Sequence, residues 1–534
     1  MRTLTLLLCL HATTLSAAPS AAVRLPSGLV IASIKIETNN VFGARVPPEN
    51  KLLYRIADRI HIKTRDTVIR RELLFAVGDR YDPSLIEETE RNLRALPFIR
   101  RAEVSAKVND LGTVDVVVHV YDSWSLEVVT GFKRVGGVTS DKAGFADSNI
   151  LGEGKTASAV YSRNGAAQSK SLVYQDPQFL NEKHLQYSMA VVTTPGNQNY
   201  SLSLNRPFYA SIAPTALGGS INFVQDNILT YSGGTRAGSV NARLGKAGLT
   251  YGIAVAPSTE RTRRVNFGLM AQRADYRAIP GQPTGPLPVS EQLGFLQLGG
   301  DWEQLDFIKV RRIQKFTHDE DYNLGFVVLP AVSWAPYIRP LASTGSQFLP
   351  GITASKGFAW LDQLLFLSSG YSSKYVNGGN GNRLASFDVM YFAGDLGSQT
   401  LAFHTAWNLG WHLDPAAPLT LGEANGLRGY GLSPFTGDRS FLFNIEDRIF
   451  VRDELWRLID VGAVVFYDSG YAWPSSSSVK LADLKSSVGL GLRVAPSRSG
   501  SNNPVRVDLA RALNDNQTRS RWSLSILAGQ AFGP

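Results

Sequence analysis

The chain is almost free of cysteine: Cys9 is the only one among its 534 residues. Cys9 lies within the first 18 residues, which have the features of a secretion signal that is removed on export. The mature protein would therefore have neither a disulfide nor a thiolate metal site.

Long hydrophobic runs are missing as well. No later stretch approaches the roughly 18 consecutive apolar residues that indicate a membrane-spanning helix. Two classes of exported protein remain, a soluble periplasmic protein and a membrane β-barrel. The mean hydropathy of −0.07 fits both, because barrel strands alternate apolar with polar residues.

Motifs of common enzyme classes are also absent. The stretch 152–156 resembles the end of a phosphate-binding loop, but Asn149 stands where the first glycine of that motif is required. There is no GxSxG and no HExxH motif. The acidic run 318–321 could bind a cation, although a solvated loop is the simpler interpretation. We therefore expect no catalysis, no cofactor and no bound metal.

The first residues indicate export. Arg2 gives a positive start, an apolar segment follows at 4–10, and 16–18 is a cleavage site of small residues. We expect residues 1–18 to be a signal peptide. A buried N-terminal helix or an anchor is the alternative, but the apolar segment is far shorter than a spanning helix needs.

The net charge of +9 and the pI near 9.4 make the chain basic. Its lysines and arginines are dispersed, and several alternate with apolar residues instead of clustering on one helix. We therefore expect no nucleic-acid partner. Contact with anionic outer-membrane lipid and lipopolysaccharide explains the charge more simply.

The character of the sequence changes near residue 122. Before it, strand-like and helix-like segments predict the order β-α-α-β-β within 29–122, with a helical insertion at 49–61 after the first strand. After it, helix signals nearly vanish, and strand-like runs are separated by turn residues. In 487–494, for example, Val and Leu alternate with Ser, Gly and Arg.

A soluble sandwich would alternate in the same way. The number of such runs over 123–534, without a domain break, favours a membrane barrel, which needs about 9 to 11 residues per strand. The predicted fold class is mainly β: a C-terminal transmembrane antiparallel β-barrel of about 16 strands, preceded by one small α/β domain.

Five segments, in the same order along the chain, resemble the BamA/TamA superfamily of outer-membrane assembly proteins and bacterial surface antigens. The stretch from Ile69 to Val120 is similar to the second half of a POTRA domain, 145–154 to the family's early barrel hairpin, and 174–177 to a turn soon after it. Residues 427–430 match the motif of the family's long sixth extracellular loop, and 466–470 match the strand that receives this loop. The resemblance implies an outer-membrane barrel with a periplasmic POTRA-like domain.

The resemblance also implies a candidate site. The loop motif is Leu427, Arg428, Gly429 and Tyr430, and Asp468 and Gly470 lie on the receiving strand. If Arg428 enters the barrel lumen, its guanidinium group needs carboxylates. Glu446 and Asp508 lie on the polar faces of their strands and could complete an acidic receptor for Arg428. The alternative is that these are ordinary lumen charges solvated by pore water.

A seam between the first and last strands would be the family's lateral gate. We expect Trp124 near the first strand, and Trp522 and Phe532 on the last. The chain departs from the family in two respects. It has room for one POTRA-like domain where BamA has five and TamA three, and it ends two residues after Phe532.

The leading functional hypothesis is an outer-membrane protein assembly or polypeptide translocation factor that acts without covalent chemistry. Its candidate partners are client polypeptides in the periplasm and accessory periplasmic proteins. A single POTRA-like domain would not offer the docking sites that the family's usual accessory proteins use. The alternative is a transport or structural barrel for small solutes or lipids, because fold alone does not settle function.

Overall fold

The computed structural model describes most of the chain. The described residues are 25–43, 48–135, 138–164, 167–232, 235–281, 287, 289–338, 343–394, 398–414, 417–431, 434–500, 502–514 and 522–534. The signal peptide expected at 1–18 lies outside them and stays a prediction.

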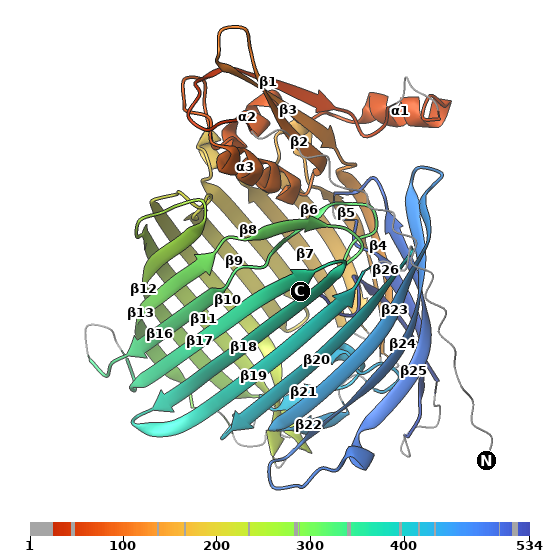
Figure 1. Cartoon of the computed structure of the whole chain (residues 1–534). Coiled ribbons are helices and arrows are strands. Elements are labelled where there is room, and N and C mark those ends of the chain that lie inside the picture. The colour runs from red at the N-terminus through yellow and green to blue at the C-terminus, as the bar shows by residue number, and fades with distance from the viewer. Residues whose placement is uncertain are drawn as a thin grey trace, which may run out of the picture.

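The N-terminal domain is a three-stranded sheet with helices packed on it (Figure 1). Its elements are β1 (Ile31–Asn39), α1 (Leu52–Ile60), α2 (Asp66–Glu72), α3 (Pro83–Ala95), β2 (Ile99–Val108) and β3 (Val114–Asp122). The sheet order is β1-β3-β2, so β2 lies at an edge, and β1 is parallel and β2 antiparallel to β3. The predicted β-α-α-β-β order is confirmed, with α1 as the helical insertion.

Local sequence explains these elements. The four valines at alternate positions from Val114 to Val120 are fully buried and form the sheet side of the core. Pro83 begins α3, and the Asp82 side chain caps it by accepting a hydrogen bond from the Ser84 amide at 2.8 Å. Among the described residues, no helix is long and apolar enough to cross a membrane.

The rest of the chain is a closed antiparallel barrel. Its strands are β4 (Leu126–Val135), β5 (Val138–Asp147), β6 (Thr156–Asn164), β7 (Ala167–Asp176), β8 (Gln186–Thr194), β9 (Asn197–Arg206), β10 (Thr215–Ser232), β11 (Thr235–Ala254), β12 (Arg261–Ala278), β13 (Glu291–Gln304), β16 (Val327–Ala335), β17 (Gln347–Trp360), β18 (Gln363–Val376), β19 (Gly379–Ala393), β20 (Gln399–Trp411), β23 (Arg439–Leu455), β24 (Ile459–Trp473), β25 (Lys485–Pro496), β26 (Val505–Ala512) and β27 (Trp522–Ala528).

The fold class is therefore confirmed, and the described part of the chain places twenty strands in the barrel where about 16 were expected. The difference arises from the connections and not from the strand lengths. The six strands β4 to β9 have the expected nine or ten residues each, but only two residues separate β4 from β5, β6 from β7 and β8 from β9.

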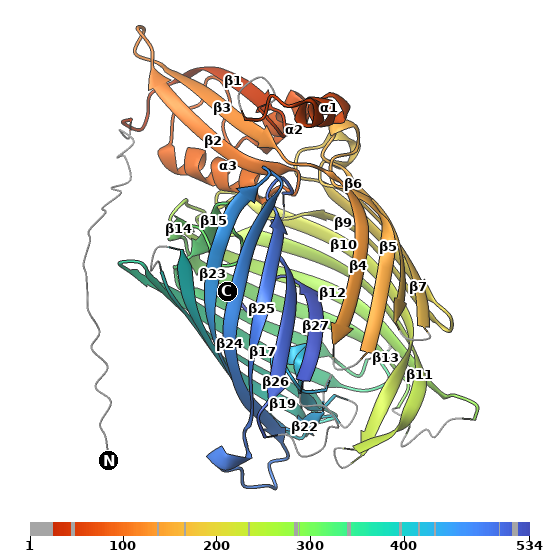
Figure 2. The same ribbon diagram turned by 90° about the vertical axis from the view of Figure 1, so that its right-hand side faces the viewer.

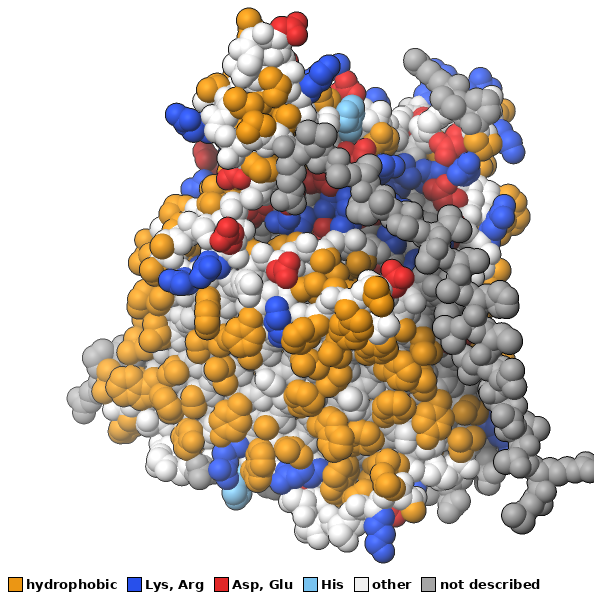
Figure 3. Space-filling model, in the orientation of Figure 1, with side chains coloured by type: hydrophobic (Ala, Val, Ile, Leu, Met, Phe, Trp, Pro, Cys, Tyr) orange, Lys and Arg blue, Asp and Glu red, His pale blue; other side chains and the backbone are white. Residues whose placement is uncertain are grey.

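The alternation of side chains has the predicted sense. On β25 and β27 the outward Leu490 and Leu524 are 62% and 44% exposed, whereas the inward Ser525 is 1% exposed. Figure 3 shows the result on the visible face, where hydrophobic side chains form a broad band around the barrel. The inner face carries the polar and charged residues.

Few contacts close the barrel between its first and last strands. Among the described residues, β27 and β4 share one register pair, Ile526 with Arg134, whereas β26 and β27 share seven. Figure 2 looks onto this closure, where β27 lies beside β4. The seam is thus the least paired junction of the described barrel.

Two segments leave the barrel wall and enter its interior. At the end that carries the N-terminal domain, the segment 305–326 between β13 and β16 contains the hairpin β14 (Phe307–Val310) and β15 (Glu320–Asn323). At the opposite end, the loop 412–438 contains the paired β21 (Leu419–Leu421) and β22 (Phe435–Gly437). The short 3-10 turns are η1 (Ile150–Gly152), η2 (Phe179–Asn181), η4 (Glu423–Asn425) and η5 (Leu481–Asp483).

Candidate functional site

The loop motif lies inside the barrel. Leu427, Arg428 and Tyr430 are all buried, with Arg428 only 1% exposed. Gly429 has φ of +87°, and a Cβ atom there would lie 3.2 to 3.3 Å from Ser487 and Ala510 on the wall. Only glycine combines this backbone conformation with so close an approach. The loop therefore presses its tip against β25 and β26.

The Arg428 side chain meets carboxylates on three strands. Its Nε and Nη2 atoms lie 2.7 Å from the two oxygens of Asp468 on β24, which is a bidentate pair. Its Nη1 atom lies 2.6 Å from Glu446 Oε1 on β23, and 3.6 Å from Asp508 Oδ2 on β26. The three carboxylates predicted for the receptor thus surround the guanidinium group, with Asp508 just outside hydrogen-bond distance.

Aromatic and amide groups complete the setting of Arg428. Its guanidinium carbon lies 3.4 Å from the centroid of the Phe466 ring, which is a cation–π contact. The Arg428 backbone amide donates to Asp468 Oδ2 at 3.2 Å. Asn444 donates to Asp468 Oδ1 at 2.7 Å and to the Gly426 carbonyl at 2.8 Å. Asp468 is therefore held by the loop and by β23 together.

The remaining motif residues fix the loop without touching Arg428. The Tyr430 hydroxyl lies 2.7 Å from the Ser486 carbonyl and 2.8 Å from Asn514 Oδ1. Gly470 lies on the same face as Asp468, and a Cβ atom there would meet Leu421 of the loop at 2.9 Å. Gly470 thus gives the loop room to pack against β24.

Arg448 is the most important residue that the sequence interpretation missed. Its Nε atom donates to Glu446 Oε2 at 3.0 Å, its Nη1 atom to the Ile313 carbonyl at 2.5 Å, and its Nη2 atom to the Phe532 carbonyl at 2.8 Å. Because Asn444, Glu446 and Arg448 occupy alternate positions of β23, their shared face was a signal that could have identified them.

Arg493 on β25 was also missed. Its Nη1 atom lies 2.5 Å from Asp508 Oδ1, so Asp508 is paired with Arg493 more closely than with Arg428. Arg428, Arg448 and Arg493 thus share the buried carboxylates of Glu446, Asp468 and Asp508. Such a network braces the loop, because each charge would be costly to bury without its partner.

Comparison with known proteins agrees with this architecture. Residues 61–122 match the family model described as POTRA, surface antigen variable number repeat. A stretch of 153 residues is 30% identical to the outer membrane protein assembly factor BamA of Neisseria meningitidis serogroup B. Residues 61–122 are thus a POTRA domain, and the chain is similar to the outer-membrane assembly protein BamA. That match covers 27% of this chain and 19% of the Neisseria protein, so the chain spans about a fifth of the length of its curated relative.

Solved structures that the chain matches have low sequence identity to it and TM-scores below 0.5. BamA from Haemophilus ducreyi lacking POTRA domains 1–3 is 14% identical, with 93% of this chain and 83% of that chain covered and a TM-score of 0.35. CdiB from Escherichia coli is 11% identical, with coverage of 97% and 92% and a TM-score of 0.47. The chain is an outer-membrane β-barrel protein with a periplasmic POTRA domain, and outer-membrane proteins of this kind are generally not enzymes.

The POTRA domain is docked on the periplasmic rim of the barrel. Glu88 of α3 accepts hydrogen bonds from the Ser211 amide at 2.7 Å and its hydroxyl at 2.6 Å. Gln178, after β7, donates to Glu72 at 2.6 Å and to the Val68 carbonyl at 3.1 Å. These buried contacts position the domain over the mouth of the barrel (Figure 2).

The residues expected at the seam lie in three different places. Trp522 is the first residue of β27 and points outward. Trp124 packs against Val41, Phe42 and Tyr54 of the POTRA side, and its amide donates to the Arg498 carbonyl at 2.7 Å, so it does not face β27.

The expectation that Phe532 lies on the last strand is wrong. β27 ends at Ala528, and Gly529 then turns with φ of +82°. The chain enters the lumen, where the Phe532 ring lies 5.1 Å from that of His404. The reason is that Arg448 binds the Phe532 carbonyl, and an apolar cluster including Phe392 accepts its ring.

Within the described residues, no group of three or more His, Cys, Asp or Glu side chains could hold a metal ion. The carboxylates of the network are instead shared among arginines. The arrangement holds the loop against the inner face of β23 to β26.

Proposed function

We propose that this protein inserts or translocates client polypeptides at the outer membrane by opening the seam between β27 and β4, without catalysing a covalent reaction. The observation that carries the proposal is the single register pair, Ile526 with Arg134, that joins these strands. Separating β27 from β4 would break fewer hydrogen bonds than separating any other two neighbouring strands of the described barrel.

The loop motif supports this proposal because of its place. Arg428 and Tyr430 fasten the loop to β24, β25 and the segment after β26, and these strands precede β27 in the barrel wall. Because the loop braces these strands, this part of the barrel wall would keep its shape while β27 separates from β4. In this proposal, residues 123–534 form the barrel and 29–122 the POTRA-like domain, with Asp468, Glu446 and Asp508 as the receptor for Arg428.

The POTRA domain supplies a surface for clients. β2 pairs with β3 alone among the described strands, so its other edge is available for an added strand. A cavity of about 700 Å³ runs along this edge and is lined by α3, β2 and β14. Client polypeptides are therefore the proposed periplasmic partners, while outer-membrane lipid and lipopolysaccharide surround the barrel, and accessory periplasmic proteins could share the same edge.

A disulfide across the seam tests the proposal directly, because the mature chain would contain no cysteine of its own. Ile526→Cys with Arg134→Cys places the new thiols on paired residues, and Val507→Cys with Ile526→Cys is a matched control on the β26–β27 junction. We expect the oxidised seam variant to deplete a defined set of outer-membrane or secreted proteins, as measured by proteomics. The control disulfide should have no such effect.

A transport or structural barrel for small solutes or lipids is the second candidate. It predicts that the seam disulfide leaves the outer-membrane proteome unchanged while depletion of the protein alters permeability. That result would overturn the assembly proposal.

A further inference from the structure

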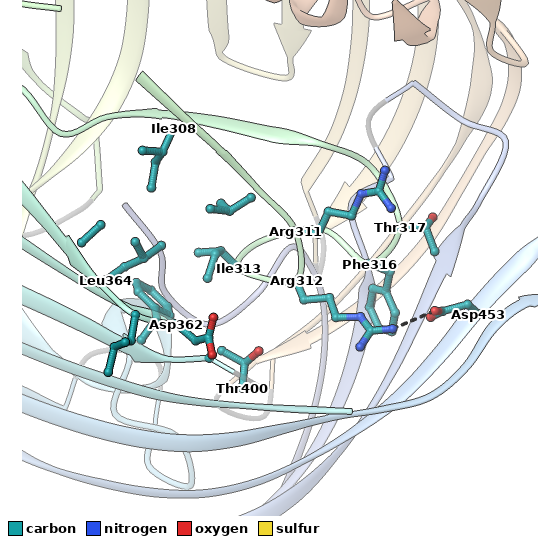
Figure 4. A pocket seen from close by; sticks show the side chains of 15 residues that line it. Ile308, Arg311, Arg312, Ile313, Phe316, Thr317, Asp362, Leu364, Thr400 and Asp453 are labelled. Atoms are coloured by element: carbon teal, nitrogen blue, oxygen red, sulfur yellow. Dashed lines mark hydrogen bonds and ion pairs between the residues drawn. The ribbon is translucent and has the colours of Figure 1, made fainter. Parts of the chain in front are cut away.

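The segment 305–326 crosses the periplasmic mouth of the barrel. Figure 1 shows this green segment running from the β13–β16 side beneath the POTRA helices, and Figure 4 shows it close by, reaching toward Asp453 on β23. Arg312 of the segment pairs with Asp453 at 2.9 Å. A connection between neighbouring barrel strands needs only a short turn, so these 22 residues are an insertion into the lumen.

The tip of the segment is fastened to the far wall. The amides of Phe316 and Thr317 donate to Asn502 Oδ1 at 2.9 and 3.3 Å, and the Thr317 hydroxyl donates to Asp460 at 3.0 Å. The Phe316 ring is buried edge-on against Phe450, with centroids 5.1 Å apart. These are specific contacts that an incidental surface loop would lack.

The segment also has a defined shape of its own. The Glu320 carboxylate accepts hydrogen bonds from the amides of Ile313 and Gln314 at 3.0 and 2.9 Å, and from the Tyr322 hydroxyl at 2.8 Å. Because one side chain satisfies several backbone groups of the loop, these hydrogen bonds hold residues 313–322 in one defined conformation.

The other side of the segment meets the wall at β18 and β19. Ile313 is buried in one apolar cluster with Leu364 and Phe392, and Ile308 and Tyr322 pack against this cluster. A cavity of about 590 Å³ lies beside these contacts, with Ile308, Ile313 and Leu364 among its lining residues (Figure 4). Retraction of the segment must therefore separate Ile313 from this cluster, next to which there is free volume.

A charged cluster joins the segment to the POTRA domain. Arg94 of α3 makes a bidentate pair with Asp321 at 2.9 and 2.6 Å and also pairs with Glu90. Glu90 lies 3.5 Å from Lys309 Nζ and accepts the Val104 amide of β2 at 3.1 Å. The Glu90 carboxylate thus occupies the Val104 amide of the edge strand β2 and also pairs with Lys309 of the segment.

We propose that the segment 305–326 is a retractable plug of the periplasmic mouth, released when an extended polypeptide adds to β2. An added strand must take the Val104 amide from Glu90, which weakens the cluster of Glu90, Arg94, Lys309 and Asp321 that holds the hairpin in place. The release step rests on the proposed function, whereas the plug itself does not depend on it.

A reversible disulfide tests the plug. Thr317→Cys with Asp460→Cys would join the tip to the wall where their side chains already meet. The purified full chain is placed in planar lipid bilayers in potassium chloride solution. We expect open-channel current from the reduced protein and its loss on oxidation. A second variant, with 311–318 replaced by a short Gly-Ser linker, should conduct constitutively.

The release step is tested with a synthetic peptide of the β27 sequence as the added strand. The peptide should increase the open fraction of the reduced protein, and Arg94→Gln should raise it without peptide. Arg101→Gln, an exposed arginine of β2 paired with Glu103, is the matched control and should have no effect.

Equal currents from oxidised, reduced and linker variants would overturn the plug. A current that responds to oxidation but not to the peptide or to Arg94→Gln would overturn release by strand addition. The seam disulfide between residues 134 and 526 separates these results from the proposed function, since it should stop client assembly and leave the plug-dependent current unchanged.

Discussion

Arg448 donates from Nε to Glu446 Oε2 at 3.0 Å, and this pair connects three segments that enter the barrel from different parts of the chain. Through Glu446 it reaches Arg428 of the extracellular loop, and through its other nitrogens it binds the carbonyls of Ile313 and Phe532. Both charges are fully buried. Loss of either one would leave the other unpaired inside the barrel, which is far more costly than the pair itself.

Arg428→Ala should impair function more than it impairs insertion of the barrel, because Arg428 braces the loop from inside and is not part of the outer wall. Breaking the buried pairs should cost about 3 to 5 kcal/mol of local stability. Arg428→Lys should rescue partly, since an ammonium group cannot make the bidentate contact with Asp468. The checks are client assembly in cells and heat-modifiable migration of the folded barrel on gels.

Asp468→Asn should reproduce the effect of Arg428→Ala, because it removes the charge that the guanidinium group needs. The double variant should be little worse than either single variant, which is the property of residues in contact. Strictly additive losses in the same two assays would argue against a functional role for the pair.

Arg448→Gln should increase the open-channel current in planar bilayers. The substitution removes the donors that hold the Ile313 and Phe532 carbonyls, so both lumen segments lose an anchor. Arg511→Gln on β26, whose side chain lies 5.7 Å from the outward Trp522 ring, removes the same charge outside the lumen and serves as the control. Identical currents from both variants would show that Arg448 anchors neither segment.

Leu490→Arg should destabilise the barrel by about 2 to 4 kcal/mol if Leu490 faces the middle of the bilayer. Ser523→Asn, on the inner face, is the control and should be tolerated. Alternation alone would also predict tolerance at Gly491, but a Cβ atom there would lie 2.2 Å from Asp508 Oδ1, so Gly491→Ser should disturb the ionic network. Melting monitored by gel migration measures all three, and equal stability of the Leu490 and Ser523 variants would contradict the assignment of faces.

Asp122→Asn should stabilise the junction between the POTRA domain and the barrel at neutral pH. Burial raises the pKa of Asp122 from 3.8 to about 6, although the Thr64 amide donates to the carboxylate. Between these pH values the unfolded chain loses the proton and the folded chain keeps it, so stability falls as pH rises toward 6 and stays low above it. The penalty at pH 7.5 is on the order of 3 kcal/mol.

Hydrogen exchange of 61–122 in the full-length protein, corrected for the intrinsic exchange rate, measures this difference. The Asn variant should be better protected than the native protein at pH 7.5, and the two should converge below pH 4. Equal protection at pH 7.5 would mean that the ionised carboxylate carries no penalty at this position.

The sequence by itself determined the class of the protein and much of the candidate site. A side-chain period of two, repeated between turn residues, requires strands with one apolar face, and the lack of long apolar runs leaves a barrel as the membrane-spanning form. The pairing of the motif residues Arg428 and Asp468 could be predicted from the sequence, because a buried guanidinium group needs a carboxylate. All of these arguments rest on local patterns or on one charge requiring another.

Only the tertiary structure decided where distant segments meet. The number of strands depends on turn lengths that differ along the chain, and Phe532 leaves the last strand because Arg448, 84 residues earlier, binds its carbonyl. The fold of 305–326 into the lumen likewise depends on Asn502, Asp460 and Arg448. Such contacts cannot be predicted from a periodic sequence pattern, since they form only when the closed barrel brings these distant residues together.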